Sequence, residues 1–312
     1  MTSLPPAPKV VIVGAGAMGC LFAARIAEAG AEVTVVDVDR ERLARIAAEG
    51  ITLTDDTGTR TLPVGAAVAA DVAAPVDLVV LFTKGMHSAA AIASVAHLAT
   101  SAPVALTLQN GIGNAELLAE GFGADHVLLG TAHIPADLKG PAAVLTHGFG
   151  HLHVGGLTAK SHGSAPAVVD LLARSGFGAT LADDINAAVW EKVAFNAALN
   201  ASGMICEVPN AGLDNEPGRR IATAVVEETV AVAAAAGIRI DRDEIVHNVD
   251  AALREHAHHK ASMLQDREHK RATEIETING AIAREGARLG VPTPVCATLA
   301  DLVRVIEIRA KS

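Results

Sequence analysis

Residues 9–19 read KVVIVGAGAMG, and this stretch decides the fold of the first half of the chain. Its first five residues are largely β-branched, which predicts a short strand buried on both faces, as in the centre of a parallel sheet. The glycines that follow have the spacing Gly-x-Gly-x-x-Gly. The first allows a tight turn, the second lets a pyrophosphate approach the backbone, and the third lets the next helix pack closely on the strand. We therefore expect a dinucleotide-binding turn whose cofactor contacts come from Gly14, Gly16, Ala17, Met18 and Gly19.

The residues after this turn strengthen the interpretation, because the glycine motif alone is a weak signal. A helix is expected from about Met18 to Ala29, and its first N–H groups would face the phosphates. A second strand, EVTVVD, covers residues 32–37 and ends at an acidic side chain. Asp37 is placed to accept hydrogen bonds from both ribose hydroxyls of NAD, whereas Asp39 is better placed to cap the helix expected over residues 40–49.

Two further buried strands end at polar residues. Residues 78–83 read LVVLFT and precede Lys84, and residues 104–108 read VALTL and lead to Asn110. Ligands bind at the carboxyl ends of strands in open α/β sheets, so both side chains are candidate cofactor contacts. The alternative for Lys84 is an exposed loop lysine, and for Asn110 it is an ordinary Asn-Gly turn.

The rest of the first half departs from strict strand–helix alternation. Residues 51–62 predict an inserted hairpin, and residues 127–155 predict an antiparallel extension of the sheet that includes residues 142–147. His151 and His153 would share one strand face, but no cysteine or carboxylate flanks them, so we expect exposed strand residues and no metal site. We assign residues 1–182 to a Rossmann-type dinucleotide-binding domain.

The second half, residues 183–312, is expected to be an all-helical domain, which makes the fold class α/β followed by α. One helix, from about residue 185 to residue 200, carries Lys192, Asn196 and Asn200 at intervals of four among apolar residues. Such side chains form a ladder on one helix face. A solvated face is the alternative, but asparagine is a poor residue for a helix interior. Three directed donors suit an anionic, oxygen-rich ligand.

Later segments complete the helical domain. Asp241 resembles the N-cap of a capping box, with Glu244 as its partner. A long helix is expected to bury a stripe of Ile275, Ile278 and Ile282, with Glu274 beside that stripe. The histidines of this region do not converge on one helix face, so we interpret them as exposed residues and not as metal ligands.

Composition limits the possible partners. The chain has 25 Lys+Arg against 35 Asp+Glu, a net charge of −10, which argues against nucleic acid and anionic membranes. Three distant cysteines without a Cys-x-x-Cys pair fit a reduced, cytoplasmic setting. Residues 1–8 predict a frayed tail and not a signal peptide, and no apolar stretch is long enough to span a bilayer.

Taken together, these motifs resemble the ketopantoate reductase (2-dehydropantoate 2-reductase) family from Lys9 to about Ile308. The matching segments are the glycine-rich turn, Gln109-Asn110-Gly111, Lys192 with Asn196 and Asn200, Pro209-Asn210, residues 262–266 (SMLQD) and residues 273–275 (TEI). The resemblance implies NAD(P)H-dependent reduction of a 2-keto acid to a hydroxy acid, in pantothenate biosynthesis, by an oxidoreductase acting on CH–OH groups.

The resemblance also implies roles for individual residues. Lys192 would be the general acid, and Glu274 would orient the reacting groups. Lys84 and Asn110 would lie near the nicotinamide. The residues that would bind the substrate are Asn110, Asn196, Asn200, Asn210 and Ser262. The chemistry of the reaction agrees with the role of Lys192, since hydride addition to a ketone builds negative charge that a positioned ammonium can stabilise and protonate. The oligomeric state is open, and a homodimer is one expectation.

The chain departs from the family pattern at two places. His259 stands three residues before Ser262, where the family often has a substrate-binding asparagine, so the keto acid itself is open. Asp37 and Asp39 follow the second strand where NADPH-using members place a cation. Asp37 therefore favours NADH, while the resemblance favours NADPH. Arg40 and Arg42 complicate the choice, because the guanidinium of Arg40 could pair with a 2′-phosphate if the chain after Val36 brings it to the ribose.

Two alternatives remain at this stage. The first is a D-2-hydroxyacid dehydrogenase on the same scaffold that acts on another branched 2-keto acid. The second, from another class, is a non-catalytic dinucleotide sensor, which would not need Lys192, Ser262 or Glu274.

Overall fold

The computed structural model describes residues 4–311, and the chain divides into two compact units. The sheet unit contains residues up to Gln109 and Asn114–Ile185, and the helical unit contains Asn110–Gly113 and the residues from Asn186 onward. The predicted tail is wrong in part, because Leu4 packs against the core of the sheet unit; residues 1–3 of that tail lie outside the described residues. No helix within residues 4–311 has the length and apolar character needed to cross a bilayer.

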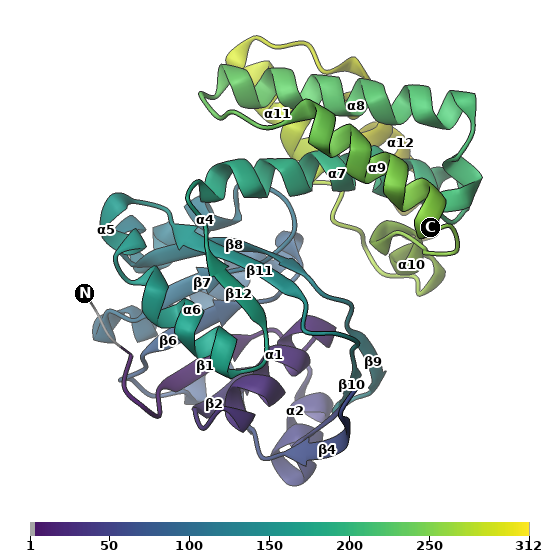
Figure 1. The fold of residues 1–312 in the computed structure, drawn as a ribbon. Helices are drawn as coiled ribbons and strands as arrows, with labels where there is room; N and C mark the ends of the chain where they lie inside the picture. Colours follow the sequence, from purple (N-terminus) through teal and green to yellow (C-terminus); the bar gives the residue numbers. More distant parts are fainter. Residues whose placement is uncertain (1–3, 312) are drawn as a thin grey trace. The chain divides into compact units, whose positions relative to one another are not determined.

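The sheet unit is built on an eight-stranded sheet with the order β12-β11-β8-β7-β6-β1-β2-β5 (Figure 1). Strands β5, β2, β1, β6, β7 and β8 run parallel, β11 is antiparallel to β8, and β12 is parallel to β11. Their bounds are β1 Lys9–Val13, β2 Glu32–Val36, β5 Gly65–Ala67, β6 Leu78–Leu81, β7 Val104–Thr107, β8 Val127–His133, β11 His151–Gly156 and β12 Gly178–Leu181.

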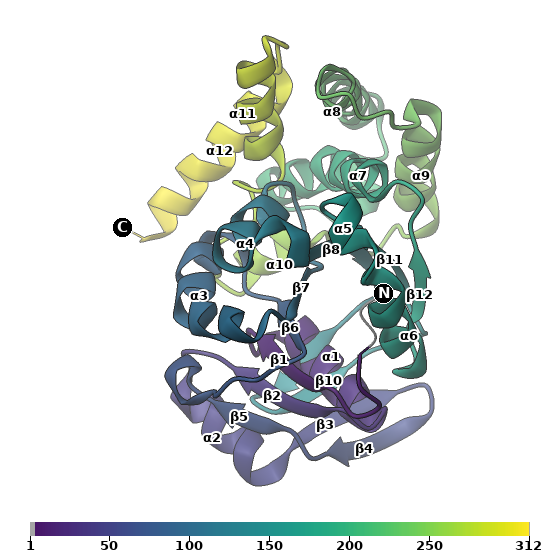
Figure 2. The same ribbon diagram turned by 90° about the vertical axis from the view of Figure 1, so that its left-hand side faces the viewer.

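Within the described part of the sheet unit, from residue 4 onward, there are six α-helices. They are α1 Ala17–Glu28, α2 Arg40–Glu49, α3 Ser88–Val95, α4 Asn114–Phe122, α5 Ala159–His162 and α6 Ala165–Arg174. Helices α3 and α4 lie together on one side of the sheet, and α1 and α6 lie on the other (Figure 2). Short 3₁₀ helices join the elements of both units: η1 Ala69–Asp71, η2 Gly85–His87, η3 Ala96–Ser101, η4 Ala124–His126 and η5 Asn210–Leu213.

A second, four-stranded sheet packs against α1. It contains the predicted hairpin, β3 Ile51–Asp55 and β4 Gly58–Leu62, together with β9 Asp137–Gly140 and β10 Ala143–Leu145, in the order β4-β3-β10-β9. The predicted antiparallel extension is therefore confirmed for β11 only. Residues 142–147 were assigned to the wrong sheet, because β10 pairs in parallel with β3. Strand alternation does not reveal which distant edge a short segment will join.

The helical unit consists of α7 Ile185–Cys206, α8 Glu216–Ala235, α9 Arg242–Glu255, α10 Ser262–Glu268, α11 Asn279–Leu289 and α12 Pro294–Lys311. Buried residues of α7 contribute Trp190, Val193, Ala197 and Leu199 to one core with the other helices. Asp241 caps α9 by accepting from the backbone N–H groups of Asp243 and Glu244, as predicted. The backbone N–H of Asp241 donates to Glu191 and not to Glu244, so the expected capping box is only half correct.

The long helix expected around Ile275 is wrong, because residues 274–278 form turns and α11 begins only at Asn279. Ile275 and Ile278 are nevertheless buried, with exposed fractions of 1% and 0%. The spacing of these two isoleucines matches the buried face of a helix, but here the packing of a turn buries them.

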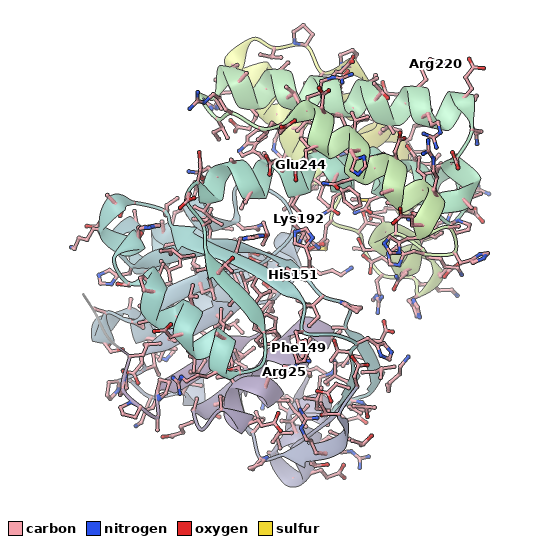
Figure 3. All side chains as sticks on the ribbon, viewed as in Figure 1. Arg25, Phe149, His151, Lys192, Arg220 and Glu244 are labelled. Carbon is pink, nitrogen blue, oxygen red and sulfur yellow. The ribbon has the colours of Figure 1, made fainter. Side chains whose placement is uncertain are left out.

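A buried ion pair joins α1 to the hairpin of the second sheet. Arg25 lies 3.7 Å from the carboxylate of Asp55, and the two side chains are 5% and 7% exposed. Its guanidinium also donates to the carbonyls of Gly176 and Gly148, close to Phe149 (Figure 3). A hydrogen bond from Arg60 holds the pKa of Asp55 well below its ordinary range. Arg25 thus fixes α1, the helix that follows the glycine-rich turn, to three separate segments.

We expect Arg25→Ala to lower the free energy of unfolding by about 3 kcal/mol, because it leaves a buried carboxylate with one partner fewer and removes two hydrogen bonds to backbone carbonyls. Arg45→Ala is the control, since Arg45 pairs with Glu49 on the exposed face of α2. Urea unfolding should show a lower midpoint for Arg25→Ala and an unchanged midpoint for Arg45→Ala. Equal midpoints for the two variants would contradict the role of Arg25.

Candidate active site

The glycine-rich turn of the sheet unit has the shape of a phosphate cradle. Gly14 has φ +108°, and a Cβ there would lie 2.9 Å from the backbone of Phe82 and Thr83. A Cβ on Gly19 would lie 1.8 Å from the carbonyl oxygen of Gly14. A Cβ on Gly16, by contrast, would meet no atom within 4 Å, so space remains beside this part of the backbone. The steric surroundings of the three glycines therefore fit the three roles expected from their spacing, and the contact of a pyrophosphate with Gly16 stays a prediction.

The start of α1 is open to a ligand as well. Gly16 is its N-cap, and no side chain forms a capping hydrogen bond there. A helix N-terminus of this kind offers backbone N–H groups and a partial positive charge to an anion. Ala17 and Met18 occupy this first turn. The cradle thus fits the pyrophosphate of a dinucleotide.

Two side chains from the region after β2 hold the glycine-rich turn from both sides. Asp37 accepts from the N–H of Ala15 at 2.6 Å with one carboxylate oxygen, and from the N–H groups of Val38 and Asp39 with the other. Arg42 donates to the carbonyl of Ala15 at 2.6 Å, and its Nε lies 3.5 Å from Asp39. From the sequence we expected a ribose contact for Asp37, and Arg40 as the arginine that could reach the ribose. In the structure it is Arg42 that reaches the turn.

At the carboxyl ends of the parallel strands, Lys84 follows β6 and Gln109 follows β7. Lys84 is partly exposed and precedes the 3₁₀ helix η2. The amide of Gln109 donates to the carbonyl of Thr83 and, at 2.9 Å, to the hydroxyl of Ser88. Gln109 therefore fixes the chain on either side of Lys84. The sequence indicated Gln109 only as part of the family motif.

Asn110, the next residue, belongs to the helical unit. Its side-chain amide donates to Glu274 at 3.0 Å. The contact is set by Gly111, which has φ +98° and whose Cβ would lie 2.3 Å from the carbonyl oxygen of Thr277. The N–H of Ile112 donates to the same carbonyl at 3.0 Å. Only glycine allows this close approach of two backbones, so the Asn-Gly pair is more than an ordinary turn.

Helix α7 carries the predicted polar ladder of Lys192, Asn196 and Asn200, of which Lys192 is labelled in Figure 3. Lys192 and Asn196 are partly exposed, whereas Asn200 is 5% exposed and donates to the hydroxyl of Ser262 at 3.3 Å. The ladder is therefore not solvated at its Asn200 end. Because Asn200 donates to the oxygen of Ser262, the hydroxyl proton of Ser262 can be donated elsewhere.

Lys192 is electrostatically coupled to Glu274. Burial lowers the pKa of the Lys192 ammonium to about 8, and the negative charge of Glu274 acts in the opposite direction. Charged groups lose hydration when they are buried, and a nearby opposite charge recovers part of that loss. The structure thus brings Asn110, Glu274 and Lys192 into one constellation, although they lie far apart in the sequence.

Asn210 is placed differently from the ladder. It is 4% exposed, and its amide donates to the carbonyl of Ala252 at 3.2 Å. Its backbone N–H donates to the carbonyl of His259. The predicted role of Asn210 in substrate binding stays a prediction. Within residues 4–311, no group of three or more His, Cys, Asp or Glu side chains is arranged to hold a metal ion.

Comparison with known proteins identifies the family of the chain. The profile described as ketopantoate reductase PanE/ApbA matches residues 10–159, and the profile described as ketopantoate reductase PanE/ApbA C terminal matches residues 184–307. The 2-dehydropantoate 2-reductase of Halobacterium salinarum is 33% identical over 301 residues, covering 96% of this chain and 99% of the relative.

Two solved structures are similar over 97% of this chain and 100% of theirs. A ternary structure of D-mandelate dehydrogenase with NADH and anilino(oxo)acetate has a TM-score of 0.92 at 29% identity. A PanE/ApbA family ketopantoate reductase from Ralstonia eutropha JMP134 has a TM-score of 0.89, also at 29% identity.

Fold, glycine-rich turn and relatives together define an oxidoreductase that acts on CH–OH groups with a nicotinamide dinucleotide. Within that class, the chain belongs to the ketopantoate reductase family. The resemblance and the α/β-plus-helical fold class expected from the sequence are thereby confirmed, and the non-catalytic sensor is not retained.

The coupling between Lys192 and Glu274 can be measured directly. We expect Glu274→Gln to lower the pKa of Lys192 below its value of about 8, because the substitution removes the charge that favours the ammonium. Glu276→Gln is the matched control, since Glu276 lies in the same turn but pairs with Arg304 and Arg284. Lysine side-chain NMR, assigned with Lys192→Arg, would follow the titration. An unchanged pKa in Glu274→Gln would contradict the coupling.

Proposed function

We propose that this enzyme reduces a 2-keto acid to the 2-hydroxy acid, with 2-dehydropantoate as the substrate, pantoate as the product and pantothenate biosynthesis as the setting. The observation that carries the proposal is the constellation of Lys192, Glu274 and Asn110 beside the Asn200–Ser262 pair. The constellation offers one acid, Lys192, with a pKa of about 8, and several hydrogen-bond donors for the carboxylate of the substrate. Those are the groups that reduction of a 2-keto acid requires.

Each side chain has a separate task in the proposed reaction. When bound, the reduced nicotinamide supplies the hydride that adds to C2 of the keto acid. Negative charge then develops on the C2 oxygen, and the ammonium of Lys192 stabilises and protonates it. Glu274 keeps Lys192 protonated and is itself held by Asn110. Ser262 donates to the substrate carboxylate while its oxygen accepts from Asn200.

We further propose that NADH is preferred over NADPH. Asp37 is fixed by three backbone N–H groups, so its carboxylate has little freedom to withdraw from a ribose 2′-phosphate. The guanidinium of Arg42 is engaged by Ala15 and Asp39. A ribose 2′-phosphate would have to compete with these two partners for the guanidinium. NADH in the similar D-mandelate dehydrogenase structure also supports this choice.

A D-2-hydroxyacid dehydrogenase acting on another 2-keto acid is the second candidate. Its support is the similarity to D-mandelate dehydrogenase, together with His259 in place of the expected asparagine. Both candidates share the same chemistry at Lys192 and differ only in the side chain of the keto acid that is accepted.

We expect Lys192→Ala to lower kcat by about two to four orders of magnitude, the range for a lost general acid, with NADH binding retained. Lys192→Arg should fail as well, because a guanidinium does not release its proton. In the wild type, kcat should fall as pH rises through about 8, since the pKa of Lys192 lies there and deprotonation removes the acid. A Lys192→Ala enzyme with near-normal turnover would refute the assignment.

Absorbance of the nicotinamide, followed with a panel of keto acids and both cofactors, tests substrate and cofactor together. The panel should contain 2-dehydropantoate, 2-ketoisovalerate and phenylglyoxylate. We expect the highest kcat/KM with 2-dehydropantoate and NADH, whereas a maximum with phenylglyoxylate would favour the second candidate. Asp37→Ser should reduce the preference for NADH, mainly through KM for NADH. A wild type that favours NADPH would show that Arg42 outweighs Asp37.

A further inference from the structure

One asparagine side chain lies inside the apolar core of the helical unit. Asn279, the first residue of α11, is 0% exposed, and the nearby Ile278 and Ile282 belong to that core. Its amide nitrogen donates to the carbonyl of Ala197 at 3.1 Å. Its amide oxygen is also buried and has no hydrogen-bond partner among residues 4–311. A buried polar atom without a partner is destabilising, so core stability does not explain an asparagine at this position.

The carbonyl that receives this hydrogen bond belongs to the helix of the polar ladder. Ala197 lies on α7 directly after Asn196 and is 0% exposed. In an α-helix such a carbonyl accepts from the N–H four residues later, and its second lone pair can accept from a side chain. Apolar packing is non-directional, whereas a hydrogen bond requires a defined distance and angle. The amide of Asn279 therefore specifies one position along α7.

Asn279 also follows directly on the turn that carries Glu274. The N–H of Ile278 donates to the carbonyl of Glu274 at 3.2 Å. The N–H of Gly280 donates to the carbonyl of Ile275 at 2.9 Å, and a Cβ on Gly280 would lie 3.0 Å from the same oxygen. These backbone contacts join the turn and the first residues of α11 into one short unit. A contact that fixes Asn279 therefore fixes Glu274 as well.

Two further hydrogen bonds hold this turn, and their partners lie outside α7. The carbonyl of Thr277 accepts from the N–H of Ile112, and the N–H of Thr273 donates to Glu307 of α12 at 2.7 Å. Neither contact fixes the turn relative to Lys192 on α7, whereas the amide bond to α7 does. This matters because the interaction between two charges weakens with distance.

We infer that Asn279 is a positioning residue for the reduction: its amide holds the turn of Glu274 at one place along α7, the helix of Lys192. The inference rests on the proposed function, in which Lys192 is the general acid. The charge of Glu274 acts on Lys192, and a turn displaced along α7 would weaken that action. The need for a directed donor explains an asparagine in an apolar core.

Asn279→Leu tests the inference, because leucine has a similar shape and removes both the donor and the unpaired oxygen. The unfolding midpoint in urea should stay close to that of the wild type. The value of kcat should fall about ten- to a hundredfold, since a misplacement of about 1 Å can cost a hundredfold, and KM for NADH should not change. The fall of kcat at high pH should move to lower pH, as in Glu274→Gln, because the charge that favours the ammonium of Lys192 acts less strongly.

A double variant and a control separate positioning from a general loss of stability. If Asn279 acts through Glu274, the double variant Asn279→Leu/Glu274→Gln should have the pH profile of Glu274→Gln alone. Thr229→Val is the matched control. Thr229 is 0% exposed and donates to the carbonyl of Val225 at 2.7 Å within α8, so this variant also removes a buried side-chain hydrogen bond. It should keep the kcat and the pH profile of the wild type.

NMR titration of the Lys192 side chain gives the same comparison without turnover. Asn279→Ala is the second variant, for which the same shift is expected if leucine does not fit the site. A wild type that reduces no 2-keto acid would refute the proposed function and leave the titration as the test of Asn279. An unchanged pKa of Lys192 in folded Asn279→Leu or Asn279→Ala would overturn the inference, whatever happens to kcat, as would additive shifts in the double variant.

Discussion

The close approach of two backbone segments in the helical unit is the constraint on which the candidate active site depends. Gly111 lies so near Thr277 that any side chain at position 111 would occupy the place of a carbonyl oxygen. Because this contact fixes residues 110–113 against the turn at 274–278, the amide of Asn110 meets Glu274. Glu274 in turn sets the charge beside Lys192. The steric requirement at Gly111 thereby helps to place Glu274, whose charge acts on the acid Lys192.

Contacts between separate segments also fix the backbone at the dinucleotide cradle of the sheet unit. Asp37 and Arg42 hold the N–H and the carbonyl of Ala15, so the turn is fixed by charged side chains as well as by its glycines. An arrangement held in this way needs little reorganisation when a pyrophosphate binds, which favours affinity. In the cofactor binding that we propose, the side chains that fix the turn are also those that a ribose phosphate would meet. The rigidity of the turn and the proposed cofactor preference therefore depend on the same two residues.

Local patterns predicted much of the fold. The strand and helix around the glycine-rich turn, the hairpin and the N-cap at Asp241 were all correct, because each depends on residues close together in the chain. The errors occurred where packing is non-local. Residues 143–145 joined the edge of β3, about 90 residues earlier in the chain, and the isoleucine stripe around 275 came from a buried turn and not from a helix.

The sequence by itself determined the chemistry that the protein can carry: a dinucleotide turn, an acidic residue after the second strand, and a lysine and two asparagines on one helix face. Only the tertiary structure decided which of these groups act on one another. The pairing of Asn110 with Glu274, the coupling of Glu274 to Lys192 and the contact of Asn200 with Ser262 join residues 62 or more positions apart. Burial lowers the pKa of Lys192 to about 8, and the carboxylate of Glu274, which is far away in the sequence, acts in the opposite direction. Neither effect can be read from the residues next to Lys192 in the sequence.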